Sequence, residues 1–151
     1  MDLEKIMSKD LIVGSVDDKL SDIALLMQQR DIGFMPIAEE DQIVGVITDR
    51  DIVINCLSNN DTDCEVKDYI TRNIISIDIN DSIEDAIEIM GDEKIKRLLV
   101  SNDGNLVGII SLSDIITTNI DNQIIVDNLK KLWKIDKNTD HLNPKVDEFK
   151  L

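Results

Sequence analysis

The stretches Thr48-Asp49-Arg50-Asp51 and Ser111-Leu112-Ser113-Asp114 decide the fold, because they lie 63 positions apart (48 to 111) at the same place in two copies of one pattern. Each follows an apolar stretch that contains a glycine, Gly45 in the first copy and Gly108 in the second. The same offset joins Asp18 to Asp81, Met27 to Met90 and Ile32 to Ile95. A repeat of this length, with its turn glycine, helix faces and acidic residues in phase, indicates one duplicated supersecondary unit. Because a duplicated unit usually packs against its twin, we look for function between the copies.

The first copy predicts the order strand, helix, strand, strand, helix. Asp17-Asp18 follows the first apolar stretch and supplies a helix cap, and apolar residues then recur at helical spacing. This apolar stripe is Leu20, Ile23, Ala24 and Met27. The expected elements are a strand over 12–16, a helix that ends at Gly33, strands over 34–38 and 43–48 around an acidic turn, and a helix from Asp49.

The second copy repeats these elements. Its stripe is Ile83, Ala86, Ile87 and Met90, its hairpin strands are expected over 97–101 and 106–111, and its closing helix begins near Leu112. A right-handed crossover should place the first two strands of each unit in parallel, with the helices on one face of the sheet. Two such units can pack their sheets about a pseudo-twofold axis, and this arrangement leaves two related clefts.

A linker and a C-terminal region complete the chain. Residues 59–64 are polar and turn-forming, which is typical of a linker. Residues 120–151 begin with a helix whose apolar face is Ile125, Leu129, Leu132 and Trp133. From Lys134 onward the pattern is lost apart from Val146, Phe149 and Leu151, so the tail is either loose or docked by these residues.

Composition limits the class of ligand. The chain has 151 residues and 42% hydrophobic content, enough for one compact domain or for two half-sized units that share a core. Aromatic residues make up 3% and the net charge is -15, so the chain lacks both stacking platforms for bases and a basic surface for a polyanion. We therefore expect no direct binding to nucleic acid. A small anionic ligand would need a site with its own positive potential.

Signals for secretion, membrane insertion and metal binding are lacking. Met1–Lys5 does not begin a signal peptide and no stretch is long enough to span a bilayer, so we expect a cytoplasmic protein with no membrane partner. Cys56 and Cys64 are the only cysteines, and we expect two reduced thiols near the linker. The one histidine, His141, gives no zinc site and is expected to be solvated.

The two closing motifs have two interpretations. A hydroxyl followed three residues later by a carboxylate is a helix-capping arrangement, which alone explains both motifs. The alternative is a nucleotide site, because free amides at a helix N-terminus suit phosphate and a nearby aspartate can accept from both ribose hydroxyls. No nucleophile, base and orienting group occur together, so we do not expect an enzyme.

The order of elements and the ending Gly-apolar-apolar-Thr/Ser-x-x-Asp resemble the CBS motif, named for cystathionine β-synthase, whose paired form is the Bateman module. The resemblance covers about residues 2–53 and 65–116 and includes Met35-Pro36-Ile37. The second copy also resembles repeats of the regulatory γ subunit of AMP-activated protein kinase. The resemblance implies an α+β fold in which tandem CBS motifs, 1–58 and 65–119, pack as a pseudo-twofold Bateman module.

The resemblance also implies two adenosyl sites. In CBS pairs that bind adenosine nucleotides, the closing motif holds phosphate and ribose, and the matching residues here are Thr48, Asp51, Ser111 and Asp114. The base lies between the first strand and the start of the second, at Ile12, Val13, Gly14, Met35 and Pro36 in the first copy and at Ile75, Ser76, Ile77, Leu98 and Leu99 in the second. A phosphate cation is expected from Arg50 beside apolar Phe34 in the first cleft, and from Arg97 in the second. A surface arginine laid along an apolar strand also explains Arg97.

Three classes of function follow. The first, implied by the resemblance, is a regulatory sensor that binds AMP, ADP, ATP, S-adenosylmethionine or another adenosyl ligand, requires no cofactor and signals to a separate partner. The second is a structural or interaction module whose clefts stay empty, and an enzyme is the least supported class. We expect a homodimer, formed through the helix that carries Leu25 and Leu26. We expect the more highly charged ligand in the first cleft, because Arg50 lies in its motif.

Overall fold

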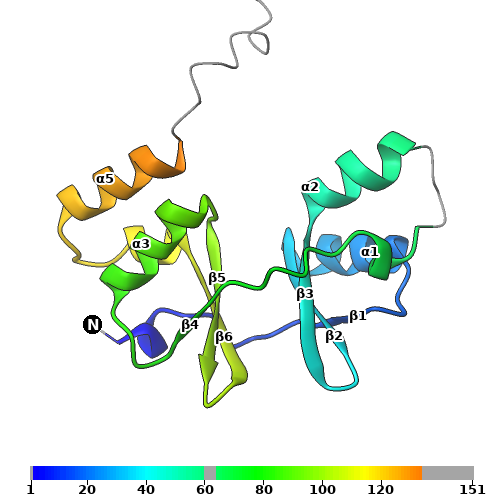
Figure 1. Cartoon of the computed structure of the whole chain (residues 1–151), viewed down its shortest axis with the longest axis horizontal. Coiled ribbons are helices and arrows are strands. Elements are labelled where there is room, and N and C mark those ends of the chain that lie inside the picture. Colours follow the sequence, from blue (N-terminus) through cyan, green and yellow to red (C-terminus); the bar gives the residue numbers. More distant parts are fainter. Residues whose placement is uncertain (1, 60–63, 134–151) are drawn as a thin grey trace, which may run out of the picture.

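Two similar units make up the protein (Figure 1). The computed structural model describes residues 2–59 and 64–133. The first unit contains β1 (Gly14–Ser15), α1 (Leu20–Arg30), β2 (Phe34–Glu39), β3 (Gln42–Thr48) and α2 (Asp49–Asp51), which continues as a π-helical turn (Ile52–Cys56) and a 3-10 turn (Leu57–Asn59). We call residues 49–59 the α2 segment. The second unit contains β4 (Ser76–Asp78), α3 (Ile83–Glu93), β5 (Arg97–Asn102), β6 (Asn105–Ser111) and α4 (Leu112–Ile116), and it is followed by α5 (Asn122–Leu132).

Each unit has a three-stranded sheet with the same topology. β1 pairs in parallel with β2, which pairs antiparallel with β3, and β4, β5 and β6 repeat this order. The register is repeated as well: Gly14 lies opposite Ile37, and 63 positions on Ile77 lies opposite Val100. The expected parallel pairing and the α+β fold of two strand-helix-strand-strand-helix units are therefore confirmed.

Two expectations about helix ends are wrong. α1 ends at Asp31, whose backbone is left-handed (φ 53°), rather than at Gly33, and Lys94 ends α3 in the same way (φ 57°). Asp18 does not cap α1, because its carboxylate accepts a hydrogen bond of 2.8 Å from the amide of Ser15 and so closes the turn before the helix. A short carboxylate can form a turn of this kind as well as a cap, and the sequence pattern does not distinguish the two.

The second unit completes its core with the N-terminal segment of the chain. A 3-10 turn at Leu3–Lys5 packs against it, and Leu3 and Met7 are buried in its hydrophobic core. Ser8 and Ile109 exchange two backbone hydrogen bonds of 2.8 and 3.0 Å. The first residues of the chain therefore belong spatially to the second copy of the repeat.

The first unit receives the matching segment, residues 64–71, which follows the linker. Val66 is fully buried in the first core, where Cys64, Tyr69 and Ile70 also pack. Thr71 and Val46 exchange two backbone hydrogen bonds of 2.9 and 3.0 Å. Each unit thus takes its first segment from the opposite half of the chain.

The repeated glycine lies inside a strand, at the point where the exchanged segment passes. A Cβ atom on Gly45 would lie 2.8 Å from the carbonyl oxygen of Thr71, and one on Gly108 would overlap the thioether of Met7. Only a hydrogen atom fits without a shift of the neighbour. The expectation of a turn glycine is therefore wrong. Glycine is needed at this position because another segment of the chain passes close to the strand.

α5 covers the outer face of the second unit. It lies beside α3 in Figure 1, and Ile87 and Met90 of α3 are buried together with Ile125 of α5. The two helices approach closely, because a Cβ atom on Gly91 would lie 2.9 Å from Oδ1 of Asn128. The predicted C-terminal helix therefore covers the second core. Residues 134–151, including His141, lie outside the described residues.

The equivalent face of the first unit is open. Ala24 takes the place of Ile87 in the repeat but is exposed, so the apolar stripe predicted for α1 is only partly buried. A hollow of about 510 Å³ lies between α1 and the α2 segment, and no helix of the described residues covers it. We define the open helix face as Ala24, Leu25, Val53, Ile54 and Leu57, all of which are exposed.

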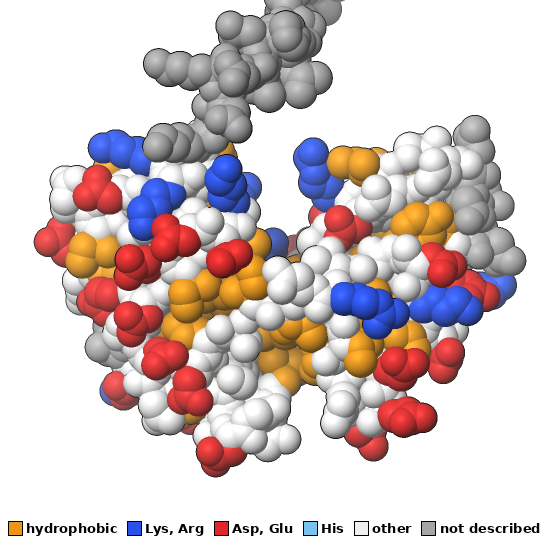
Figure 2. Space-filling model, in the orientation of Figure 1, with side chains coloured by type: hydrophobic (Ala, Val, Ile, Leu, Met, Phe, Trp, Pro, Cys, Tyr) orange, Lys and Arg blue, Asp and Glu red, His pale blue; other side chains and the backbone are white. Residues whose placement is uncertain are grey.

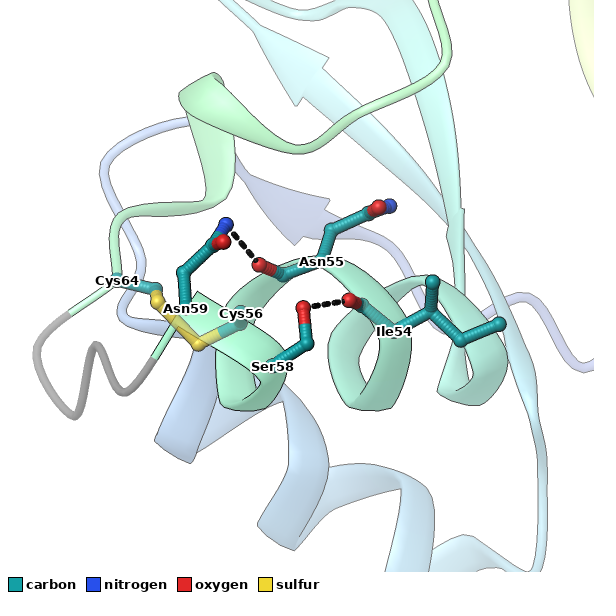
Figure 3. The surroundings of a disulfide bond; sticks show 6 residues. All are labelled: Ile54, Asn55, Cys56, Ser58, Asn59 and Cys64. Carbon is teal, nitrogen blue, oxygen red and sulfur yellow. Dashed lines mark hydrogen bonds between the residues drawn. A yellow bond between two sulfur atoms is a disulfide. The ribbon is translucent and has the colours of Figure 1, made fainter.

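Cys56 and Cys64 form a disulfide (Figure 3), so the expectation of two reduced thiols is wrong. The α2 segment carries Cys56 toward residues 64–71 where these return to the first unit, and the two Cα atoms lie 6.2 Å apart. Beside the disulfide, the side-chain amide of Asn59 donates a hydrogen bond of 2.6 Å to the carbonyl of Asn55. The hydroxyl of Ser58 donates to the carbonyl of Ile54. The disulfide therefore ties the end of the first unit to the exchanged segment.

Candidate ligand-binding clefts

Among the cavities between the units in the described residues, two border a closing motif, and each combines the closing motif of one unit with residues of the other. The Thr48 cleft, of about 610 Å³, is lined among others by Phe34, Thr48, Asp51, Ile75, Lys96 and Arg97. The Ser111 cleft, of about 290 Å³, is lined among others by Ile12, Asp31, Phe34, Arg97, Ser111 and Asp114. Figure 2 shows a groove between the units with Lys and Arg side chains on both of its walls.

The two clefts are related residue by residue through the repeat. Positions 63 apart take equivalent places: Ser8 and Thr71, Asp10 and Asn73, Ile12 and Ile75, Asp31 and Lys94, Gly33 and Lys96. Phe34 and Arg97 form such a pair themselves, and both line both clefts. Cζ of Arg97 lies 6.0 Å from the centroid of the Phe34 ring, so a cation–π contact forms part of the wall that the clefts share.

Each closing motif caps its helix with reciprocal hydrogen bonds. Oδ2 of Asp51 accepts from the amide of Thr48 at 2.9 Å, and the amide of Asp51 donates to Oγ1 of Thr48 at 3.1 Å. Asp114 and Ser111 repeat this pair of bonds at 2.8 and 3.3 Å. Both closing motifs therefore form the helix caps that their spacing predicts. In both aspartates the cap uses Oδ2, and Oδ1 has no hydrogen-bond partner among the described residues.

A third capping box shows that this arrangement also occurs away from the clefts. Ser82 and Asp85 make the same reciprocal bonds at the start of α3, both at 3.0 Å, but they line neither cleft. Hydrogen bonds from the hydroxyl and the amide of Ser82 lower the pKa of the Asp85 carboxyl below its usual value. A capping box alone therefore does not indicate a binding site. The other two boxes are candidates because they line the clefts.

The Thr48 cleft gathers positive charge in an acidic protein. Its basic residues are Arg50, Lys94, Lys96 and Arg97, and its acidic residues are Asp49, Asp51 and Glu93. Nζ of Lys96 also lies 5.1 Å from the centroid of the Trp133 ring, at the end of α5. In a chain of net charge -15, these four basic and three acidic side chains give the cleft a small excess of positive charge, which favours an anionic ligand.

The structure distributes the predicted site residues over several places. Phe34, Thr48, Arg50, Asp51, Ile75, Arg97 and Leu99 line the Thr48 cleft. Ile12, Phe34, Arg97, Ser111 and Asp114 line the Ser111 cleft. Val13 and Ser76 lie with Leu99 in a third hollow, near the two hairpin turns. Gly14, Met35, Pro36, Ile77 and Leu98 are buried and line none of these three cavities.

The expectation that each copy supplies its own cleft is wrong. Ile12 of the first copy lines the Ser111 cleft, and Ile75 of the second copy lines the Thr48 cleft. Arg97, expected only beside Ser111, lines both clefts. The exchanged segments cause this, because residues 8–12 and 71–75 each run along the opposite unit. Sequence reasoning also missed Lys94 and its counterpart Asp31, although the offset of 63 positions pairs them.

Comparison with known proteins identifies the family. A family model described as the CBS domain matches residues 3–57 and again residues 66–120. The chain belongs to the CBS domain family. The predicted resemblance and the CBS pair are thereby confirmed.

Relatives of the chain include a protein of similar size and a much larger enzyme. It is 30% identical over 118 residues to the CBS domain-containing protein YhcV of Bacillus subtilis, covering 78% of this chain and 84% of YhcV. It is 33% identical over 115 residues to the inosine-5'-monophosphate dehydrogenase of Thermoplasma acidophilum, but these are 76% of this chain and only 23% of the enzyme. The second match therefore provides no reason to assign the enzyme's activity to this chain.

Solved structures give the same fold. The CBS domain pair of protein MJ0100, solved in complex with 5'-methylthioadenosine and S-adenosyl-L-methionine, has a TM-score of 0.70 and 25% identity, covering 77% of this chain and 93% of that one. Within residues 2–59 and 64–133, no helix is long and apolar enough to cross a membrane. The same residues contain no group of three or more His, Cys, Asp or Glu side chains that could hold a metal ion.

Proposed function

We propose that this CBS pair is a regulatory protein that binds an adenine nucleotide in the Thr48 cleft and passes the change to a separate protein. The observation that carries the proposal is the convergence of four basic side chains on this cleft in a chain of net charge -15. The adenosyl ligands in the CBS pair of MJ0100 support an adenine compound as the ligand class.

The Thr48 cleft offers a partner for each part of a nucleotide. Oδ1 of Asp51 is available to accept from ribose hydroxyls while Oδ2 keeps the helix cap. Arg50, Lys94, Lys96 and Arg97 are available for phosphate oxygens. Phe34 and Ile75 supply an apolar wall for the base. Because the wall comes from both units, a bound nucleotide bridges them, and its binding free energy can favour one arrangement of the pair over another.

The output of this binding is an interaction with another protein. We propose that two copies associate through the open helix face of the first unit, because α5 already covers the equivalent face of the second unit. A separate effector protein would then respond to the nucleotide-bound dimer. The proposal requires no cofactor and no catalytic step.

Isothermal titration calorimetry with AMP, ADP and ATP tests the proposed function. We expect binding to strengthen with the number of phosphates and to weaken as salt screens the basic side chains. Arg50→Ala should weaken ATP binding by about tenfold or more, since a hydrogen bond to a charged group contributes roughly 1.5–3 kcal/mol. Lys130→Ala is the matched control, because Lys130 is an exposed cation of α5 outside the cleft. Absence of binding by all three nucleotides would refute the proposal.

A second candidate function is an interaction module whose clefts stay empty. The capping boxes explain both closing motifs without any ligand, and the open helix face offers a surface for a partner. The calorimetric panel separates the two candidates, because only the sensor produces heat of binding. A dimer that binds none of the three nucleotides, nor 5'-methylthioadenosine or S-adenosylmethionine, would favour the second function.

A further inference from the structure

We infer, on the basis of the proposed function, that the Ser111 cleft binds an adenosyl compound that carries no phosphate groups. The two clefts would then accept different ligands at the same time: a nucleotide in the Thr48 cleft and a nucleoside-like compound in the Ser111 cleft. The contrast between equivalent residues of the two clefts leads to this assignment.

At equivalent positions of the repeat, the lining of the Ser111 cleft is less positive than that of the Thr48 cleft. Where the Thr48 cleft has Lys94, the Ser111 cleft has Asp31, and where the Thr48 cleft has Asn73, the Ser111 cleft has Asp10. Two further cations also lack a basic counterpart, because the position equivalent to Lys96 is Gly33 and the position equivalent to Arg50 is Ser113. Both clefts are lined by three carboxylates, which in the Ser111 cleft are Asp10, Asp31 and Asp114, but the Ser111 cleft has Arg97 as its one cation where the Thr48 cleft has four.

Asp31 and Lys94 occupy the same structural position, so their charges act at equivalent points. Each ends the first helix of its unit in the left-handed conformation, with φ of 53° at Asp31 and 57° at Lys94. A phosphate group that fits beside Lys94 in one cleft would therefore approach Asp31 in the other. In a cleft of about 290 Å³, a phosphate would lie within the screening length of about 8 Å from Asp31 at physiological salt, so salt would screen their repulsion only in part. The Ser111 cleft consequently selects against phosphate.

The groups that suit an adenosine moiety are kept in both clefts. Ser111 and Asp114 repeat the capping box and again leave Oδ1 of the aspartate available for ribose hydroxyls. Ile12 and Ile109 repeat the apolar wall of Ile75 and Val46. The volume of about 290 Å³, against about 610 Å³ for the Thr48 cleft, also favours a ligand without a polyphosphate chain.

Arg97 does not reverse this preference. It lines both clefts from their shared wall beside Phe34, and in the Thr48 cleft it stands together with three other cations. A nucleotide bound beside Thr48 would therefore engage Arg97 on that side. The carboxylates of the Ser111 cleft would then meet the second ligand without an opposing cation, which favours an uncharged or a positively charged compound.

Calorimetry with the full chain tests the assignment with three probes: ATP, uncharged 5'-methylthioadenosine and S-adenosylmethionine, whose sulfonium adds a positive charge. We expect one ATP per chain, and one molecule of either adenosyl probe to bind to protein already saturated with ATP. Asp114→Asn should abolish the second event and leave ATP binding within about twofold. Tighter binding of S-adenosylmethionine than of 5'-methylthioadenosine identifies a cationic preference, and the reverse order identifies an uncharged ligand.

Charge variants at the equivalent positions complete the test. Asp31→Lys installs the residue found at position 94 and should create a second ATP site, whereas Asp31→Asn should weaken S-adenosylmethionine binding by about fivefold or more. Asn adopts the left-handed conformation readily, so Asp31→Asn remains informative if Asp31→Lys does not fold. Two ATP molecules per wild-type chain, or no adenosyl probe bound beside ATP, would overturn the assignment while leaving the proposed function intact. Binding of the probes without any ATP binding would instead refute the proposed function alone.

Discussion

In the described part of the chain, three helices begin with the same pair of reciprocal hydrogen bonds, and two of these capping boxes border a cleft. The boxes of Thr48 with Asp51 and of Ser111 with Asp114 face the space between the units, whereas Ser82 with Asp85 does not. The chemistry of the three boxes is alike, so any difference in ligand binding must come from their surroundings. This contrast supplies an internal control for the proposed ribose contact.

Asp51→Ala and Asp85→Ala should therefore both destabilise the fold, but they should differ in their effect on nucleotide binding. Both variants lose a cap and should melt at a lower temperature, and at Asp51 the loss should be about 1 kcal/mol of stability. Only Asp51→Ala should also weaken nucleotide binding, by about tenfold or more. Thermal melts and calorimetry check both effects. Unchanged nucleotide affinity in Asp51→Ala would show that this residue is a cap only.

The cap of α3 should respond to acid in a defined direction. Hydrogen bonds from Ser82 lower the pKa of Asp85 in the folded protein, so its contribution to stability is complete above the ordinary pKa of an aspartate. That contribution is lost as the pH falls below the ordinary value through the lowered one. Comparison of urea unfolding at neutral and acidic pH should show a smaller loss for Asp85→Asn than for the wild type. Equal losses would argue against this assignment.

The two strand glycines should tolerate a methyl group unequally. A Cβ atom on Gly45 meets the backbone carbonyl of Thr71, which cannot move without breaking the bonds to Val46. A Cβ atom on Gly108 meets the flexible end of the Met7 side chain. We expect Gly45→Ala to cost about 1–3 kcal/mol of stability and Gly108→Ala clearly less, as measured by urea unfolding. The reverse order would mean that Met7 is the more rigid neighbour.

At the scale of elements, sequence periodicity predicted most strands and helices because each needs only local information. The offset between Gly45 and Gly108 also placed both closing motifs at equivalent points of the fold. The exchange of the first segments was beyond this reasoning, since a residue such as Ile12 fits an apolar wall in either unit. The sequence therefore predicted the wrong pairs of segments for the lining of each cleft, although it predicted the positions of the closing motifs in the fold. Cys56 and Cys64 were misjudged for the same reason, because their proximity depends on where residues 64–71 return.

The disulfide should contribute measurably to stability. It joins residues with a sequence separation of 8, and closing a loop of this length in the unfolded chain corresponds to about 2–3 kcal/mol. A reducing agent should therefore lower the urea midpoint of the wild type but not that of a Cys56→Ser, Cys64→Ser variant. Two thiols that react freely with iodoacetamide in the folded protein would contradict the pairing. Disulfides persist mainly in oxidising compartments, so the same measurement bears on the predicted cytoplasmic location.

At the scale of the whole molecule, the two units differ most on their outer helix faces. α5 shields the second unit, whereas on the first unit Leu25 is 51%, Val53 58% and Leu57 56% exposed. The repeat sharpens this difference, because the position equivalent to Leu25 on α3 is Glu88. The exposed apolar face of the first unit, with a charged residue at the matching place of the second, supports the proposed association of two copies through the first unit.

Sedimentation should accordingly show a particle of twice the chain mass at micromolar concentration. Leu25→Glu, which copies the residue of the second unit, should shift the protein from dimer to monomer. The monomer should still be folded, as a cooperative thermal melt would show. Glu88→Gln serves as the control and should leave the dimer unchanged. A wild-type monomer at all concentrations would refute association through the open helix face.

The exchange of first segments also sets the order in which the protein can fold as it is synthesised. Residues 3–8 are synthesised well before Ile109, the residue with which Ser8 pairs. The first core likewise waits for Val66, which follows the linker. The first unit is complete once residues 64–71 have been synthesised, so it can fold before the second unit, whereas residues 3–8 must wait for β6 before they can pack.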